Sequence, residues 1–164
     1  MEPLIQAVAG PALQLATLLT EDRMVAEDIV QEALLRAWQS PRTPRDIVSF
    51  RRWVYRIVVN LARDRHRRAV VWDRLRMLTR PAPDPGALVE DRATGAVLRE
   101  ALRRLSRRER EAVYLRFFED AHYQEVAEIL GSSEGTCRVL IHRALKKVAA
   151  RLSAEGLAPE GLQT

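Results

Sequence analysis

Residues 123–145 read YQEVAEILGSSEGTCRVLIHRAL, and this stretch decides the fold of the second half of the chain. Its first part carries apolar side chains at helical spacing, which predicts a short helix over residues 123–130. Gly131 is placed to end that helix in a left-handed conformation, and Ser132-Ser133 can cap a longer helix from residue 134 to about residue 152. A short helix, a glycine-containing turn and a longer helix are typical of a helix-turn-helix.

The longer helix has two different faces. Its inward stripe consists of Cys137, Leu140, Ile141, Ala144, Leu145 and Val148. Its opposite face carries Arg138, Val139, His142, Arg143 and Lys146. The second helix of a helix-turn-helix enters the major groove, where cations suit phosphates and guanine edges. An ordinary solvated face of an arginine-rich helix fits the same spacing equally well, so the pattern alone leaves both interpretations open.

Two further helices are predicted upstream of this motif. The first has a helical stripe made of Val97, Leu98, Ala101, Leu102 and Leu105. Ser106 and Glu109 have the spacing of a capping box, so the next helix is expected to begin there. Its buried residues are expected to be Ala112, Val113 and Phe117.

The first half of the chain is predicted to form three helices. Residues 2–19 are apolar, and Gly10-Pro11 predicts an interruption within them. A second helix starts near Val25, and a third is expected to be capped by Ser49 and to end near Arg68 or slightly beyond. The expected buried stripes are Val25, Ile29, Val30, Ala33, Leu34, Ala37 and Trp38, then Phe50, Trp53, Val54, Ile57, Val58, Leu61 and Ala62. No stretch has a strand pattern, so the fold class is all-α.

A proline-rich stretch separates the two halves. Residues 79–86 read TRPAPDPG, which suits neither a helix nor a central strand and predicts a flexible linker. Residues 1–80 carry 14 basic and 9 acidic side chains, and residues 99–152 carry 12 basic and 8 acidic ones. Two basic blocks therefore flank a mildly acidic hinge.

Cations and aromatic residues alternate along the third helix. Its arginines are Arg51, Arg52, Arg56, Arg63, Arg65, Arg67 and Arg68, and its aromatic residues are Phe50, Trp53 and Tyr55. This mixture suits single-stranded nucleic acid, whose bases stack and whose phosphates pair with guanidinium groups. Phe50 and Trp53 equally suit a core. Tyr55 and Asn60 fall off the apolar stripe and are the better candidates for contact.

Composition excludes several classes of protein. The chain has 164 residues, of which 47% are hydrophobic and 30% charged, with a net charge of +5. This is too apolar for a disordered chain, and we find no stretch that approaches the roughly 20 apolar residues of a membrane span. The single cysteine, Cys137, excludes an intramolecular disulfide. No histidine has a ligand or catalytic partner at a recognised spacing, so we expect no enzyme activity, no metal and no cofactor.

Three segments in order resemble the extracytoplasmic-function (ECF) group of bacterial sigma-70 family sigma factors. Residues 26–34, AEDIVQEAL, resemble the family's AEDLVQEAF. Residues 49–62, SFRRWVYRIVVNLA, resemble its FRAWLYRIARNLA. Residues 105–110, 123–131 and 134–136 follow its C-terminal helix-turn-helix.

The resemblance implies a transcription initiation factor acting in the cytoplasm. It implies sigma region 2 over residues 1–70, a linker over 71–96, sigma region 4 over 97–152, and a polar tail over 153–164. The implied partners are core RNA polymerase, through its β and β′ subunits, promoter DNA and an anti-sigma factor, without membrane insertion.

The resemblance also assigns roles to individual residues. Core polymerase binding falls on Asp28, Gln31 and Glu32. Binding of the −10 element falls on Arg52, Tyr55, Arg56, Asn60, Arg63 and Arg67, with Asn60 similar to the residue that captures a flipped-out base. Binding of the −35 element falls on Thr136, Arg138, Val139, His142, Arg143 and Lys146. Where the family usually has valine-lysine-serine-arginine, this chain has residues 137–140, CRVL, which predicts a shifted −35 specificity.

Two other classes of protein stay open at this point. A dimeric helix-turn-helix regulator would account for residues 99–152 but leaves the first block and the linker unexplained. A protein-interaction adaptor would make both basic faces incidental.

Overall fold

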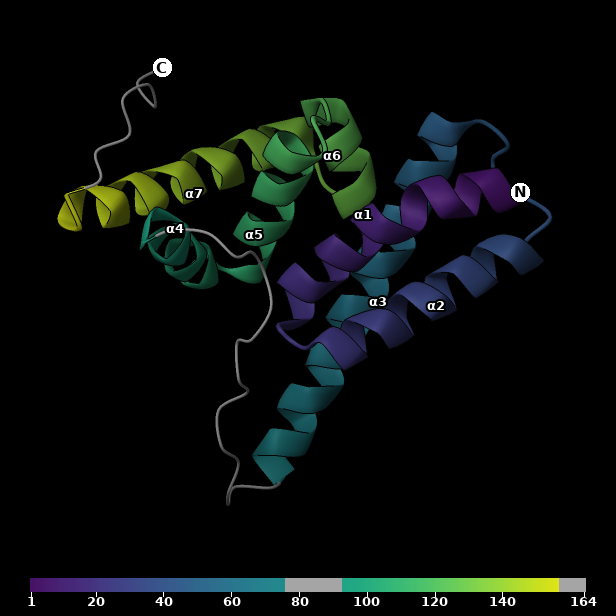
Figure 1. The fold of residues 1–164 in the computed structure, drawn as a ribbon, viewed down its shortest axis with the longest axis horizontal. Coiled ribbons are helices and arrows are strands. Elements are labelled where there is room, and N and C mark those ends of the chain that lie inside the picture. Colours follow the sequence, from purple (N-terminus) through teal and green to yellow (C-terminus); the bar gives the residue numbers. More distant parts are fainter. Residues whose placement is uncertain (76–92, 157–164) are drawn as a thin grey trace. The chain divides into compact units, whose positions relative to one another are not determined.

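The computed structural model describes residues 1–75 and 93–156, with side chains described within 1–69 and 97–156. The secondary structure within these ranges is helical, in agreement with the predicted all-α class (Figure 1). The chain divides into two compact units, residues 1–85 and 86–164. The proline-rich stretch 79–86, where a linker is predicted, lies outside the described residues.

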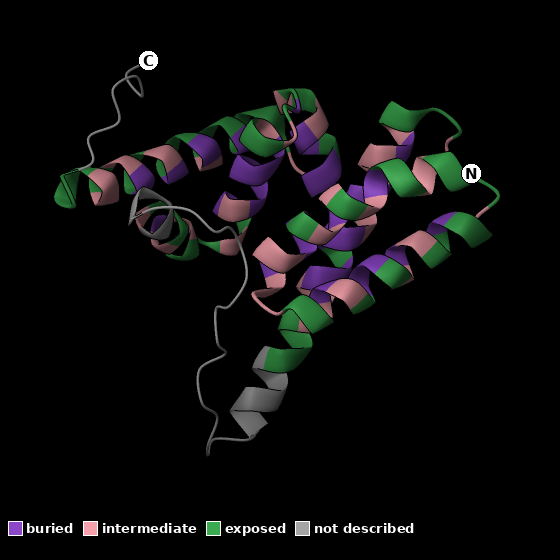
Figure 2. Cartoon of the chain, viewed as in Figure 1, coloured by how far each residue is buried: buried purple, intermediate pink, exposed green. Residues whose placement is uncertain are grey.

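In the described part of the first unit, three helices pack against one another. They are α1 (Glu2–Thr20), α2 (Arg23–Gln39) and α3 (Ile47–Leu75), and each contacts the other two. Leu15, Ile29 and Phe50 come from the three different helices and are fully buried between them. Figure 2 shows the buried residues gathered on the faces that these helices turn toward one another.

Helix α1 is continuous, so the predicted interruption at Gly10-Pro11 is wrong. Proline removes one backbone donor and costs a helix interior about 3 kcal/mol. Val8, Ala12 and Leu15 are fully buried on both sides of Pro11, and burying such side chains offsets that cost. By length and composition α1 could also cross a membrane, contrary to our expectation from the sequence. The core helix of a soluble protein and an N-terminal signal sequence can have the same length and composition.

Capping places the starts of α2 and α3. The Asp22 side chain accepts hydrogen bonds from the backbone N–H groups of Met24 and Val25. Asp46 accepts one from the backbone N–H of Ser49 at 2.8 Å, so Asp46 and not Ser49 caps α3. That hydrogen bond also lowers the pKa of the Asp46 carboxyl. Helix α3 continues beyond Arg68 and ends at Leu75.

Helix α7 is the centre of the second unit. This unit contains α4 (Ala93–Arg103), α5 (Arg107–Val113), the π-helix η1 (Tyr114–Phe118), α6 (Tyr123–Leu130) and α7 (Glu134–Ala154). Helices α4, α5 and α6 all contact α7. The apolar cluster between α4, α5 and α7 consists of Ala101, Leu105, Val113, Ala144 and Val148.

Several local predictions for the second unit are confirmed. Ser106 and Glu109 form the capping box of α5. Gly131 ends α6 with φ 61°, a left-handed conformation that glycine adopts without steric cost. Ser133 caps α7 by accepting a hydrogen bond from the backbone N–H of Thr136 at 3.1 Å. The turn of the helix-turn-helix is therefore built as its sequence indicates.

The predicted burial of Phe117 is wrong, since its side chain is 52% exposed. Residues 114–118 form a π-helix, whose wider turn changes the direction of the side chains that follow it. Tyr114 and Leu115 are buried in this segment instead. Tyr114 donates a hydrogen bond to Glu119 at 3.2 Å, while Phe117 and Phe118 face outward.

Candidate nucleic-acid interfaces

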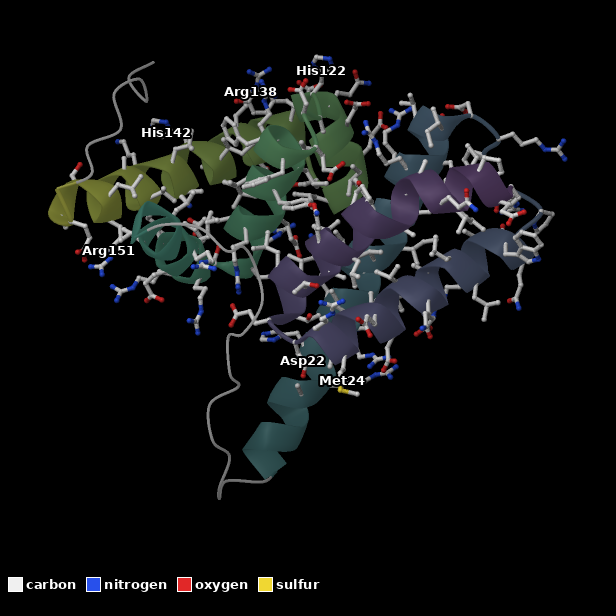
Figure 3. The ribbon with its side chains drawn as sticks, viewed as in Figure 1. Asp22, Met24, His122, Arg138, His142 and Arg151 are labelled. Carbon is white, nitrogen blue, oxygen red and sulfur yellow. The ribbon has the colours of Figure 1, made fainter. Side chains whose placement is uncertain are left out.

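The outward face of α7 is exposed as the sequence predicts. Every residue predicted for this face is exposed: Arg138, Val139, His142, Arg143 and Lys146. On the inward stripe Cys137, Ile141, Ala144 and Val148 are buried, whereas Leu140 and Leu145 are half-buried. Figure 3 shows Arg138 and His142 projecting from the edge of α7 opposite α4 in that view. The helix thus offers one polar, mainly cationic face to solvent.

Arg138 is held by residues of its own unit. Its guanidinium lies 4.4 Å from the ring centroid of Tyr123 in α6, a cation–π distance. Its Nη2 is 3.6 Å from a carboxylate oxygen of Glu134. Arg116 approaches the same tyrosine ring at 5.4 Å. These contacts fix Arg138 on the side of the face that adjoins α6.

Thr136 stands at the start of the same face. It is exposed, and its hydroxyl oxygen lies 2.8 Å from that of Ser133, within hydrogen-bond distance. It therefore takes part in the N-terminal cap and is accessible as well.

The first unit carries a second basic face, on α3. Arg56, Asn60 and Arg67 are exposed, and Arg52 and Arg63 are half-buried. Successive positions in this set are three or four residues apart, which places all of them on one side of the helix. An amide therefore lies among guanidinium groups on one surface of α3.

Tyr55 does not share that surface, because its side chain is only 1% exposed. The prediction that it lies off the buried stripe is wrong. The apolar stripe of α3 is wide enough to bury Val54, Tyr55, Val58 and Val59, because α1 and α2 both pack against this helix. Trp53, which was expected in the core, is only half-buried.

The outer face of α2 carries Asp28, Gln31 and Glu32. Asp28 and Gln31 are exposed and Glu32 is half-buried. Asp28 lies 3.6 Å from Arg65 of α3, and Glu32 lies 2.6 Å from Arg36 of its own helix.

Three exposed apolar residues share this face, and none of them was predicted to be a surface residue. They are Met24, Leu35 and Trp38, and Trp38 is 60% exposed although it was predicted to be buried. Positions 24, 28, 31, 35 and 38 alternate in steps of four and three, which is the spacing of one helix face. That spacing was the signal available in the sequence.

Within the described residues no group of three His, Cys, Asp or Glu side chains could hold a metal ion. Burial raises the pKa of the Cys137 thiol, so this side chain is less ionised than an ordinary cysteine.

Two family models match this arrangement in chain order. The model for sigma-70 region 2 matches residues 4–70, and the model for sigma-70 region 4 matches residues 96–148. The RNA polymerase sigma factor SigV of Bacillus subtilis is 34% identical over 137 residues, which cover 80% of this chain and 78% of that protein. The chain belongs to the sigma-70 family.

Its relatives place this sigma factor in the ECF group. The ECF RNA polymerase sigma factor SigL of Mycobacterium tuberculosis is 30% identical over 162 residues, covering 96% of this chain and 91% of that protein. The sigma factor RpoE of Bartonella quintana, solved in complex with the anti-sigma factor NepR, shares the fold with a TM-score of 0.75 at 23% identity, covering 94% and 97% of the two chains. Sigma factors are regulatory subunits, not enzymes.

Proposed function

We propose that this sigma factor binds core RNA polymerase and directs it to promoters through one DNA-binding face in each unit. The observation that carries the proposal is the pair of exposed basic faces, on α3 and α7, within the segments that match regions 2 and 4. A dimeric regulator would need the second face but gives no role to the first.

The outer face of α2 is the proposed docking surface for core polymerase, through the β′ subunit, with β contacting the rest of the factor. Leu35 and Trp38 are large apolar side chains left in solvent, a costly arrangement unless a partner covers them. Gln31 and Asp28 lie on the same face and supply polar groups that fix the register of a helix packed against it.

The basic face of α3 is the proposed site for the −10 element. Strand separation exposes bases whose edges an amide can bind in both donor and acceptor roles, which suits Asn60. Arg56 and Arg67 are exposed and can pair with phosphates on either side of that base, together with Arg52 and Arg63. Buried Tyr55 supports the helix from beneath in this proposal and does not contact DNA.

The outward face of α7 is the proposed site for the −35 element, read as duplex. Arg143 and Lys146 lie farther along the helix than Thr136, so cations and a hydroxyl are spread over several turns of one face. Such a distribution can contact both a phosphate strand and the floor of the major groove. His142 adds a ring that can donate or accept a hydrogen bond.

The match to the two family models supports the remaining assignments. We infer region 2 over residues 1–70, a linker over 71–96, region 4 over 97–152 and a tail over 153–164. The ends of this linker include the last turn of α3, to Leu75, and the start of α4, at Ala93. We place the factor in the cytoplasm, where polymerase and promoters are. An anti-sigma factor is the expected regulator, since a relative of this fold is known in complex with one.

Multiple-template transcription tests the proposal. Core bacterial polymerase is incubated with the full chain and a pool of templates that carry a randomised upstream segment, and the transcripts are sequenced. We expect transcripts that depend on the chain and share two sequence elements upstream of the start. Tight binding of the chain alone to duplex DNA, together with a transcript pool unchanged by the chain, would favour the dimeric regulator.

A further inference from the structure

We propose that Val139 selects a thymine in duplex DNA by contacting its 5-methyl group. The inference rests on the proposed role of α7 in duplex recognition and names one residue that sets its specificity. It follows from the position of Val139, from its neighbours and from the chemistry of the major groove.

Val139 stands where a recognition helix meets base edges. It is the sixth residue of α7, which begins directly after the Ser133 cap. Residues near the N-terminus of such a helix reach furthest into the groove. The side chain is 48% exposed, and the unit buries Cys137 and Ile141 on the other side of the helix instead.

The surroundings of Val139 are polar. His142 and Arg143, one helical turn further on, are exposed on the same face, and Arg138 precedes it. Arg138 is drawn toward α6 by Tyr123 and is paired with Glu134 of its own helix. Val139 is therefore the apolar point in the middle of a face that is otherwise built for anions and hydrogen bonds.

The major groove offers such a side chain one good partner. Valine neither donates nor accepts a hydrogen bond, so the acceptors and donors of guanine, adenine and cytosine gain nothing from it. The methyl group of thymine is the apolar group that base pairs display in this groove. Branching at Cβ also holds both valine methyl groups in a narrow set of orientations on a helix, which favours a defined contact.

The size of the effect follows from one buried methyl group. Removing one such group from water corresponds to about 0.8 kcal/mol, or about a fourfold change in affinity. The contact therefore contributes modestly to sequence specificity, in addition to the affinity that the phosphate contacts supply.

Replacing thymine with deoxyuracil tests the contact, because it removes the methyl group and keeps every hydrogen bond. Short duplexes with a randomised centre are first selected on the complex of the full chain with core polymerase. The selected duplex is then synthesised with deoxyuracil in place of each thymine in turn. Binding is measured for the unaltered chain, for Val139→Ala, and for Leu98→Ala, which shortens an exposed apolar residue of α4.

We expect one position at which deoxyuracil weakens binding about fourfold in the unaltered chain and in Leu98→Ala, with no loss in Val139→Ala. A loss that persists in Val139→Ala, or no sensitive position at all, would overturn the inference. If no duplex sequence is enriched, the proposed role of α7 in duplex recognition is itself refuted. That result differs from an enriched duplex without the expected deoxyuracil effect, which refutes only the Val139 contact.

Discussion

Replacing Lys147 with methionine tests how α7 is held to α5 in the second unit. The Lys147 ammonium donates to both carboxylate oxygens of Glu109 at 2.9 Å, across 38 positions of sequence. The backbone N–H of Ser106 donates to the same carboxylate at 2.8 Å. The Glu109 side chain is 5% exposed, whereas that of Lys147 is 54% exposed. The substitution keeps the aliphatic stem and leaves a buried carboxylate without its cation.

The expected loss is about 1.5 kcal/mol in the free energy of unfolding. Hydrogen bonds to charged groups contribute about 1.5–3 kcal/mol. The lower end of this energy range applies because the Lys147 side chain is about half exposed, so water screens the ion pair and can replace the ammonium. A loss of this size makes the slowest backbone amides of the unit exchange about tenfold faster.

Hydrogen exchange of the full chain, followed by mass spectrometry, measures this loss by segment. We expect faster exchange in peptides from α5 and α7 and unchanged exchange in peptides from α1. The three tryptophans, at positions 38, 53 and 72, all lie in the first unit, so urea unfolding followed by their fluorescence should not change. Lys146→Met, one residue away on the exposed face, is the matched control for the lost charge.

Acid titration adds a second readout. Burial alone would raise the pKa of Glu109, but hydrogen bonds from Lys147 and Ser106 outweigh it and hold the pKa below its ordinary value of 4.5. A lowered pKa in the folded state gives stability that is complete above 4.5 and is lost as the pH falls through the folded-state value. In Lys147→Met this acid-side loss should be smaller. Equal exchange rates in both proteins, or equal acceleration in α1, would refute the reasoning.

Substitutions at three further positions test the turn of the second unit and the two proposed surfaces of the first unit. Gly131→Ala should destabilise the second unit by about 1–2 kcal/mol in chemical unfolding, because φ is 61° there and a Cβ would meet no atom within 4 Å, which leaves backbone strain as the cost. Gly131→Asn, which tolerates this conformation, should cost less. Trp38→Ser should weaken binding to core polymerase at least tenfold in fluorescence anisotropy, as expected for a buried aromatic residue at an interface. Asn60→Ala should reduce open-complex formation, measured by permanganate reactivity of unpaired thymines, while polymerase affinity stays the same.

Exposed residues of the same types serve as controls for the two surface variants. Leu98→Ser also replaces an exposed apolar side chain with serine, but it does so on α4, and it should leave polymerase binding intact. Gln6→Ala removes an exposed amide from α1 and should leave open-complex formation intact. If Trp38→Ser binds polymerase normally, the outer face of α2 is not the docking surface. If Asn60→Ala lowers polymerase binding and opening equally, base capture is not its role.

Features that depend on a few neighbouring residues could be predicted from the sequence. The capping box of Ser106, the left-handed Gly131 and the Ser133 cap each satisfy backbone groups within three or four positions. Local hydrogen bonding decides such features, so the surrounding fold hardly alters them. The outward face of α7 was predictable for a similar reason, since its inward stripe is long and regular.

Features that depend on packing between helices were predicted less well. Pro11 lies inside a continuous helix because α2 and α3 bury the residues on both sides of it. Trp38 faces solvent because the buried side of α2 is already filled by small residues such as Ala33 and Ala37. Periodicity assigns apolar residues to a stripe, but the width of the stripe depends on how many partners a helix has.

Helix α7 has to serve stability and recognition with the same few turns. Lys146 belongs to its outward face, Lys147 binds Glu109 of α5, and Val148 enters the apolar cluster. Successive residues of a helix point in directions about 100° apart, so neighbouring side chains can be assigned to different tasks. Because Lys147 ties α7 to α5, it also limits rotation of α7 about its axis, and such rotation would move Val139 and Arg143 relative to a bound duplex. The loss of stability in Lys147→Met should therefore be accompanied by weaker discrimination between thymine and deoxyuracil, at a pH where the unit is still folded.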